Sequence, residues 1–290
     1  DDIRQYAQNI LAAGYPAGTL VVPGGWQSTI GSFTPNLEMY GDFAALIREL
    51  HDKGFRLMLT VTPFVSGDGP IYRAFRNSGA FVKLSDGRTA MAEWIGGYSA
   101  FYDITRETVY EMLRRQLGVL HDSLGVDGFL FDCDFHSSQY TISRGDGFAP
   151  YIHDLQTKRP LEWGLLQEMV SNILTANLLG YPYSTVSADP ALTSDSVARD
   201  PKVLLRYVQL SSVLPVAALD IAPWRITDPA VAAQCKAAFT ARERIGEYYR
   251  QLIQERARTA EPIVRHMEYE FPRNGFTDCN DQFMIGSKYL

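Results

Sequence analysis

The sequence has few of the residues that build disulfide frameworks or metal sites. Its 290 residues include three cysteines, Cys133, Cys235 and Cys279, and no two of them have the CxxC spacing of a zinc site. The five histidines form no HExxH pair. We therefore expect no disulfide framework, no metal site and no cofactor.

The chain also lacks a net positive charge and long apolar runs. The formal net charge is −6 and the isoelectric point is near 5.4, which argues against a nucleic-acid partner. No uninterrupted apolar run approaches the roughly 20 residues of a membrane span, so we expect no membrane segment in this chain. The first residues, Asp1 to Arg4, lack the pattern of a signal peptide. What remains is an ordinary globular composition, 46% hydrophobic and 21% charged.

Strand-like apolar runs alternate with helix-like runs along the chain. We expect strands at 18–22, 55–64, 101–104, 127–132, 181–186, 216–221 and 262–269, and helices at 43–53, 105–124, 165–179, 202–214 and 228–258. Such alternation predicts βα units and a parallel sheet. About seven units in one run favour an α/β fold of the (β/α)8 TIM-type over an open sheet.

The absence of a Pro/Gly/Ser-rich linker predicts one main domain. We assign residues 1–272 to a (β/α) barrel catalytic domain. Residues 273–290 consist of a loop and a short apolar run, and we interpret them as the connection to a C-terminal β-domain that is not in the chain.

Asp132 ends the most informative segment of the sequence. The residues before it, Gly128 to Phe131, form a short apolar run typical of a buried strand, and a polar loop follows. Barrels of this class place their catalytic groups at the C-terminal tips of such strands. The alternative is that Asp132 caps a strand or begins a turn.

Segments spread over nearly the whole chain resemble glycoside hydrolase family 31, and within it the branch of the myogenesis-regulating glycosidase. The similar segments are GGWQ at 24–27, LHDKGFR at 50–56 with TPFV at 62–65, WIGG at 94–97 with FYDIT at 101–105, DGFLFD at 127–132, LGYPY at 179–183, RYVQL at 206–210 and APW at 222–224. Their order and spacing together carry the resemblance.

The resemblance implies a retaining α-glycosidase that hydrolyses O-glycosidic bonds of α-glucosides or α-galactosides. Asp132 aligns with the nucleophile, and Trp26, Trp94 and Asp103 align near the sugar-binding wall. For each tryptophan, core packing is the alternative. The resemblance also implies a carbohydrate substrate, flanking β-domains in the full-length protein, and a place in the secretory pathway or outside the cytosol.

The sequence departs from the family pattern at the position of the acid/base carboxyl. Counting back from Gly180 places that position near Thr157 and Lys158, neither of which is an acid. Only about 30 residues separate Asp132 from the next expected helix, which leaves nothing spare for a long loop in a βαβ unit. We therefore predict a barrel that is incomplete or degenerate around its fifth βα unit. Asp146, Asp154 and Glu162 remain as candidates for the acid, and we take Asp154 or Glu162 as acid/base candidates.

Three smaller departures lie elsewhere. Pro23 and Gly24 stand where the family usually has a sugar-binding Asp, Leu130 replaces a Trp or Lys, and the stretch 211–224 lacks an Arg/His pair. An alternative function is therefore a catalytically impaired homologue that binds carbohydrate or a partner protein. A barrel aldolase or isomerase fits the fold, but the sequence has neither a Gly-rich phosphate loop after the late strands nor a Lys at a strand tip.

Overall fold

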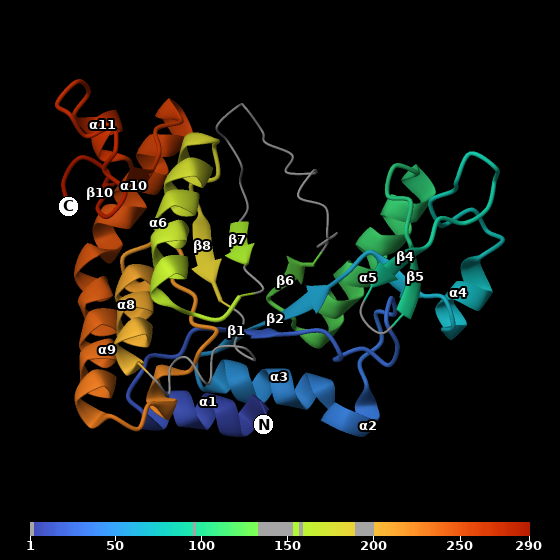
Figure 1. The fold of residues 1–290 in the computed structure, drawn as a ribbon. Helices are drawn as coiled ribbons and strands as arrows, with labels where there is room; N and C mark the ends of the chain where they lie inside the picture. The colour runs from blue at the N-terminus through green and yellow to red at the C-terminus, as the bar shows by residue number, and fades with distance from the viewer. Residues whose placement is uncertain (1–2, 95–96, 133–152, 157–158, 189–199) are drawn as a thin grey trace. The chain divides into compact units, whose positions relative to one another are not determined.

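The computed structural model describes residues 3–94, 97–132, 153–156, 159–188 and 200–290 (Figure 1). The chain divides into two compact units. Unit 1 contains Asp1–Ala12 and Pro16–Gln139, and unit 2 contains Ala13–Tyr15 and Tyr140–Leu290. Each unit has its own sheets and its own hydrophobic clusters.

Unit 1 is built around a parallel sheet with the strand order β1-β2-β6. In this sheet Val22 is paired with Leu59, and Val61 is paired with Phe131. The elements of unit 1 are α1 (Ile3–Ala12), β1 (Thr19–Val22), α2 (Leu37–Tyr40), α3 (Phe43–Asp52), β2 (Arg56–Val61), β3 (Phe64–Ser66), α4 (Pro70–Phe75), β4 (Ala92–Trp94), β5 (Gly97–Phe101), α5 (Glu107–Leu124) and β6 (Gly128–Phe131).

Helix α3 shows how local sequence produces an element and its packing. The carboxylate of Asp42 accepts a hydrogen bond from the Ala45 N–H at 2.9 Å and so caps the helix. Leu46, Ile47 and Leu50 are buried on the side that packs against β2. Burial of each such side chain stabilises the fold by about 1.5–3 kcal/mol. Gly54, with φ +84°, lies just beyond the helix end, close to the end of the predicted range 43–53.

One predicted strand of unit 1, and the end of another, belong to a different sheet than we expected. The run 55–64 is interrupted after Val61, because Pro63 has no N–H to continue a ladder. The chain then enters β3, which pairs antiparallel with β5 (Phe64 with Phe101), and β5 pairs antiparallel with β4. The strand predicted at 101–104 was therefore wrong both in its bounds and as a parallel barrel strand.

Unit 2 contains the parallel pair β7-β8 and the antiparallel pair β10-β9. In the parallel pair, His153 lies opposite Ser184 and Gln156 opposite Ser187. The elements are β7 (His153–Gln156), α6 (Trp163–Leu178), β8 (Ser184–Ser187), α8 (Pro201–Ser212), η1 (Pro223–Arg225), α9 (Pro229–Ala241), η2 (Arg242–Ile245), α10 (Gly246–Thr259), β9 (Val264–Arg265), α11 (Met267–Glu270) and β10 (Met284–Ile285).

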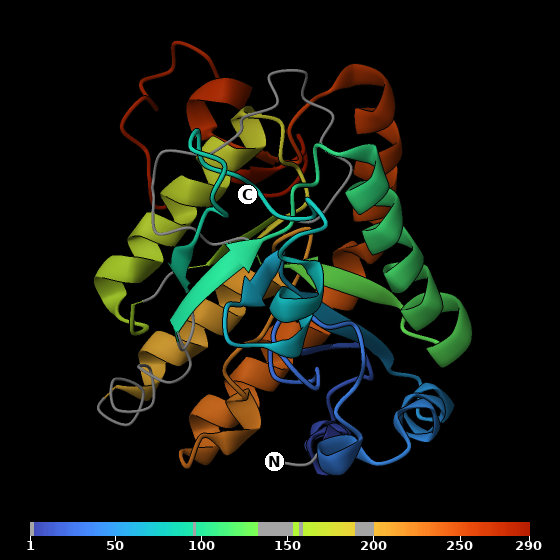
Figure 2. The same cartoon turned by 90° about the vertical axis from the view of Figure 1, so that its right-hand side faces the viewer.

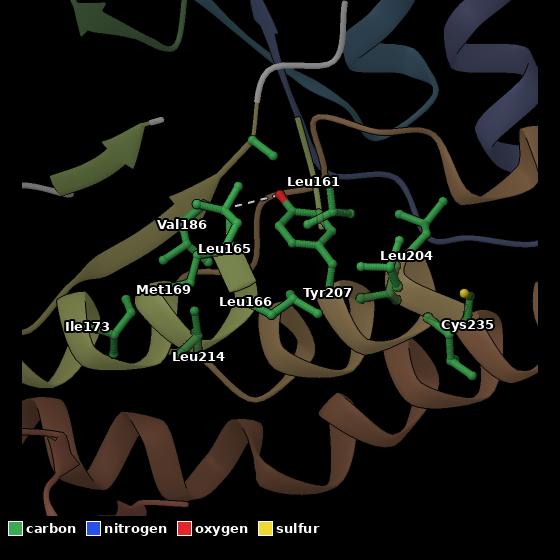
Figure 3. Packing of buried hydrophobic residues seen from close by; sticks show 14 of the residues in the cluster. Leu161, Leu165, Leu166, Met169, Ile173, Val186, Leu204, Tyr207, Leu214 and Cys235 are labelled. Carbon is green, nitrogen blue, oxygen red and sulfur yellow. Dashed lines mark hydrogen bonds between the residues drawn. The ribbon is translucent and has the colours of Figure 1, made fainter. Parts of the chain in front are cut away.

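The main core of unit 2 lies where α6 and α8 pack with β8 (Figure 3). Leu165, Met169 and Ile173 recur at helical spacing along α6 and are buried in this cluster. Tyr207 of α8 is fully buried among them, and its hydroxyl lies 3.2 Å from the carbonyl oxygen of Val186 in β8. The apolar cluster therefore includes a hydrogen bond that joins a helix to the strand beside it.

Three predicted elements of unit 2 differ in the structure. The stretch 216–221 forms no described strand, and its Ala218 carbonyl instead accepts from the Ser211 hydroxyl at 2.7 Å. The predicted helix 228–258 is divided into α9, η2 and α10. The predicted strand 262–269 is shortened to β9, because His266 accepts from the Glu268 N–H at 3.0 Å and so caps α11.

The short apolar run near residue 285 pairs within unit 2. β10 lies antiparallel to β9, and Ile285 is buried with Tyr249 and Leu252. Across the part of the chain that the structure describes, no helix is long and apolar enough to cross a membrane.

Candidate active site

Asp132 lies at the C-terminal edge of the parallel sheet of unit 1. It follows β6 directly, and its backbone N–H donates to the Val61 carbonyl of β2 at 2.8 Å. This bond extends the ladder by one residue, so the backbone of Asp132 is held against the neighbouring strand. Its side chain is partly exposed. The structure therefore places this carboxylate at the strand tip that the sequence predicted.

Trp26 lies at the same edge, because it follows β1, but its side chain is fully buried. The indole N–H donates to the Thr60 carbonyl of β2 at 2.6 Å. A buried indole with its one donor satisfied has no exposed face for a sugar ring. The geometry therefore favours the core-packing alternative for Trp26.

Trp94 lies on this side of the sheet too, at the end of β4. Its ring packs edge-to-face on Phe64, with centroids 4.7 Å apart, and Phe64 begins the strand after β2. Its Nε1 is buried with no hydrogen-bond partner among the described residues. A buried donor without an acceptor costs about 1–3 kcal/mol.

Asp103 is joined to the same region through its neighbour. The Tyr102 N–H donates to the Pro63 carbonyl at 3.0 Å, just beyond β2. The Asp103 carboxylate accepts from the Thr105 N–H at 3.2 Å and from the Thr105 hydroxyl at 2.6 Å. These bonds organise the turn before α5 and orient the carboxylate. Within unit 1 the structure thus brings Asp132, Trp94 and Asp103 to one side of the sheet.

A second carboxylate of the Asp132 segment lies at the opposite edge. Asp127 precedes β6, and its Oδ2 accepts from the Leu57 N–H at 2.7 Å and lies 2.8 Å from His51 Nε2. Burial would raise the pKa of Asp127, but the hydrogen bonds from Leu57 and His51 outweigh it and leave the pKa below its ordinary value. In barrels, the N-terminal edge serves stability, and Asp127 fits that role.

The two acid/base candidates belong to unit 2. Glu162 lies between β7 and α6, its side chain is 56% exposed, and its Oε1 is 3.6 Å from the Arg159 guanidinium. Asp154 lies in β7, where it is paired with Thr185 of β8, but its side chain is outside the described residues. Asp146, Thr157 and Lys158 also lie outside them.

Sequence reasoning missed two further carboxylates of unit 2. Asp220 Oδ2 lies 3.1 Å from the hydroxyl of the buried Tyr207, whose oxygen also contacts β8. Asp200 Oδ2 accepts from the indole N–H of Trp163 at 2.9 Å. An acid that follows an apolar run, as Asp220 follows 216–219, was a signal that could have found the first. No sequence signal indicated the second, because 37 residues separate its partners.

The described residues hold no group of three His, Cys, Asp or Glu side chains that could bind a metal ion. Cys235 is buried in α9, and burial raises the pKa of its thiol to about 11. Such a thiol is almost entirely protonated at neutral pH and is a weak nucleophile. Cys133 lies outside the described residues.

Comparison with known families gives a match over the first half of the chain. Residues 1–146 match the TIM-barrel domain of glycosyl hydrolases family 31. The matched range includes Asp132, Trp26, Trp94 and Asp103.

Individual relatives extend the likeness over the rest. The mouse myogenesis-regulating glycosidase is 23% identical over 332 residues, covering 99% of this chain and 46% of that protein. The bovine lysosomal alpha-glucosidase is 27% identical over 134 residues, which are 44% of this chain and 14% of that protein. The chain thus spans less than half the length of these relatives.

Solved structures show the fold. A Flavobacterium johnsoniae dextranase of family 31, complexed with glucose, superposes with a TM-score of 0.82 at 15% identity, covering 98% of this chain and 42% of that one. A family 31 alpha-xylosidase from a soil metagenome, complexed with xylose, superposes with a TM-score of 0.78 at 17% identity, covering 98% of this chain and 52% of that one. Together with the family match, these structures show that the chain has the (β/α)8 fold.

Proposed function

The chain belongs to glycoside hydrolase family 31, and on that premise we propose that it is a retaining α-glycosidase with Asp132 as its nucleophile. We propose that it hydrolyses the O-glycosidic bonds of α-glucosides or α-galactosides. The α-glucoside option is supported by the likeness to a lysosomal alpha-glucosidase. The main support for the nucleophile is the position of Asp132, whose backbone is bonded to β2 at the C-terminal edge of three parallel strands.

The proposed reaction has two steps. The Asp132 carboxylate attacks the anomeric carbon while a second carboxyl protonates the leaving oxygen, which gives a covalent glycosyl-enzyme. Water then hydrolyses this intermediate, and the second carboxyl acts as the base. The unmet N–H of Trp94 and the oriented carboxylate of Asp103 are proposed to bind hydroxyl groups of the sugar. Trp26 is proposed to stabilise the C-terminal edge of the parallel sheet by packing in the core and bonding to the Thr60 carbonyl.

The second carboxyl is proposed to be Asp154 or Glu162. A useful proton donor has its pKa raised by burial or by a neighbouring negative charge. Glu162 instead has a cationic neighbour, Arg159, and a largely exposed side chain. To act as the proton donor, Glu162 would therefore have to move away from Arg159.

Covalent labelling tests the nucleophile. An α-configured cyclitol epoxide or fluoroglycoside should label the parent chain on Asp132, as located by peptide mass spectrometry, and the Asp132→Asn variant should not label. Asp127→Asn is the matched control, because the same segment carries it at the opposite edge, and it should label at the parent rate. Labelling of Asp132→Asn at the parent rate would show that Asp132 is not the nucleophile.

A catalytically impaired homologue that binds carbohydrate or a partner protein is the second candidate function. The absence of an acid at 157–158 favours it. The alignment with the mouse relative is longer than this chain, so that relative has residues without counterparts here. This difference fits a shortened barrel, and we propose the fifth βα unit as the place of the shortening.

The domain assignment is also part of the proposal. Residues 1–272 are proposed as the barrel, and residues 273–290 as the connection to a C-terminal β-domain. The partial coverage of the relatives fits flanking domains in the full-length protein. The pairing of β10 with β9 anchors the proposed connection to unit 2.

A further inference from the structure

An exposed aromatic ring with a fixed orientation lies at one edge of unit 2. Trp163 is the first residue of α6, and its side chain is 50% exposed. Its single polar atom, Nε1, donates to Asp200 Oδ2 at 2.9 Å. A large apolar ring that stays half exposed to water does not gain the full free energy of burial. The hydrogen bond to Asp200 limits the rotation of the indole.

The partner carboxylate is itself anchored. Asp200 Oδ1 accepts from the Lys202 N–H at 3.1 Å and so caps α8, while Oδ2 accepts from the indole. One side chain therefore joins the beginnings of two helices. The indole plane is held at both ends, by its own helix and by this carboxylate.

The place of this pair in the fold points to binding. Trp163 follows β7 and Asp200 follows β8, and these two strands are parallel neighbours. Both residues therefore belong to connections that leave the C-terminal ends of parallel strands, where (β/α)8 proteins build their sites.

Charged residues lie close to Trp163 in the sequence. Arg159 Nη1 lies 2.6 Å from Glu168, and Arg159 Nη2 lies 3.6 Å from Glu162, the residue before Trp163. An exposed aromatic face in a segment that also carries carboxylate and guanidinium groups suits a sugar. The C–H face of a sugar can pack on the indole, and the hydroxyl groups of the sugar can form hydrogen bonds with charged side chains.

We propose that Trp163, held by Asp200, forms a stacking platform for a hexopyranose ring of an α-linked oligosaccharide. The identity of the glycan rests on the proposed function, whereas the platform itself rests on the contacts of unit 2. Trp163 contacts the sugar, and Asp200 is a positioning residue that acts through the indole.

Binding to the turnover-blocked Asp132→Asn chain tests the platform. Maltotriose and isomaltotriose, titrated by calorimetry, provide two α-linkages. Adding Trp163→Ala should weaken binding of at least one of them by about fivefold or more, which corresponds to roughly 1 kcal/mol. Trp163→Phe keeps a ring and should lose less. Tyr110→Ala is the matched control, because Tyr110 is 52% exposed but lies within α5, and it should bind like the parent.

Variants of Asp200 distinguish two roles of this residue: orienting the Trp163 ring for sugar binding, and only stabilising the fold. Asp200→Asn keeps an acceptor oxygen and a helix cap and should retain most of the affinity, whereas Asp200→Ala should lose it in part. If Asp200 only stabilises the fold, Asp200→Ala should lower the melting temperature and leave the sugar affinity of the folded protein unchanged. That result would overturn the proposal.

Two outcomes distinguish this proposal from the proposed hydrolase activity. Trp163-dependent sugar binding without labelling of Asp132 would overturn the hydrolase and support the platform. Labelling of Asp132 with equal affinities in Trp163→Ala and its parent, or no binding of either oligosaccharide, would overturn the platform. Circular dichroism of each variant identifies any that fail to fold, and in that case Trp163→Phe supplies the comparison.

Discussion

Single residues in this chain take their roles from the strand end at which they lie. Asp127 and Asp132 are five positions apart and flank the same strand. The first bonds to Leu57 and His51 at the N-terminal edge, while the second follows the C-terminal tip. In a parallel sheet, the connections at the C-terminal edge are free to vary around a site, which is why we propose the second carboxylate, and not the first, for chemistry.

Removing the Asp127 side chain should lower stability. Asp127→Ala leaves the Leu57 N–H without its partner, and we expect a loss of about 1–3 kcal/mol in the free energy of unfolding at pH 7, measured by urea denaturation. Asp122→Asn on α5, whose side chain is 77% exposed, is the control and should change little.

The pH dependence of this effect follows from the lowered pKa. A carboxylate whose pKa is depressed in the folded state stabilises the protein above its unfolded pKa, near 3.9, and that contribution is lost as the pH falls through the folded value. The deficit of Asp127→Ala relative to the parent should therefore shrink below about pH 4. A deficit that grows with acidity would contradict this assignment.

At the scale of elements, the predicted helix 228–258 shows how a side chain can decide where a helix turns. The guanidinium of Arg242 donates to the carbonyl oxygens of Ser212, Leu214 and Pro215, where α8 ends, and lies 5.4 Å from the centroid of the Tyr249 ring. The interruption between α9 and α10 begins at this residue, and Gly246, a weak helix former, follows. Periodicity predicted one continuous helix and missed the break between α9 and α10.

Truncating Arg242 should destabilise this junction. Arg242→Ala leaves three carbonyl oxygens without their donor, and we expect a cost of about 2–3 kcal/mol in urea denaturation. Arg242→Lys should recover part of the loss, because an ammonium cannot reproduce the guanidinium fork. The exposed Arg244, two residues along the chain, is the matched control. Equal costs for Arg242→Ala and Arg244→Ala would show that the three carbonyl contacts contribute nothing.

At the scale of the whole molecule, hydrolysis requires two carboxyl groups, and their candidates come from distant parts of the sequence. Retaining enzymes hold these groups about 5–5.5 Å apart. Asp132 belongs to unit 1, and both Asp154 and Glu162 belong to unit 2. The proposed activity therefore depends on which of these acids supplies the proton.

Two substrates identify that acid. Loss of the true donor should slow an α-glycoside with a poor leaving group by about 10²–10⁴-fold, and should affect an activated aryl glycoside far less, because its leaving group needs no proton. We expect this pattern for Asp154→Ala or Glu162→Ala. Glu168→Ala, which removes another acid bonded to Arg159, is the control. Parent rates on both substrates in both variants would favour the impaired homologue.

The sequence by itself determined the alternation of strands and helices, the family and the place of Asp132. The family depends on the order of short segments along the chain. The other two depend on local patterns: the apolar spacing of α3 and α6, the cap at Asp42, and a run of apolar residues that ends in an acid. Such patterns act within a few residues of each other, so they can be recognised without the fold.

Only the tertiary structure decided which strands pair in parallel, whether Trp26 faces solvent or the core, and which carboxylate meets Trp163. Each outcome depends on partners far apart in the sequence, such as Phe64 with Phe101, Trp26 with Thr60, and Trp163 with Asp200. A tryptophan has the same propensity whether it is buried or exposed. Its role depends on the atoms that surround it, and folding alone brings those atoms together.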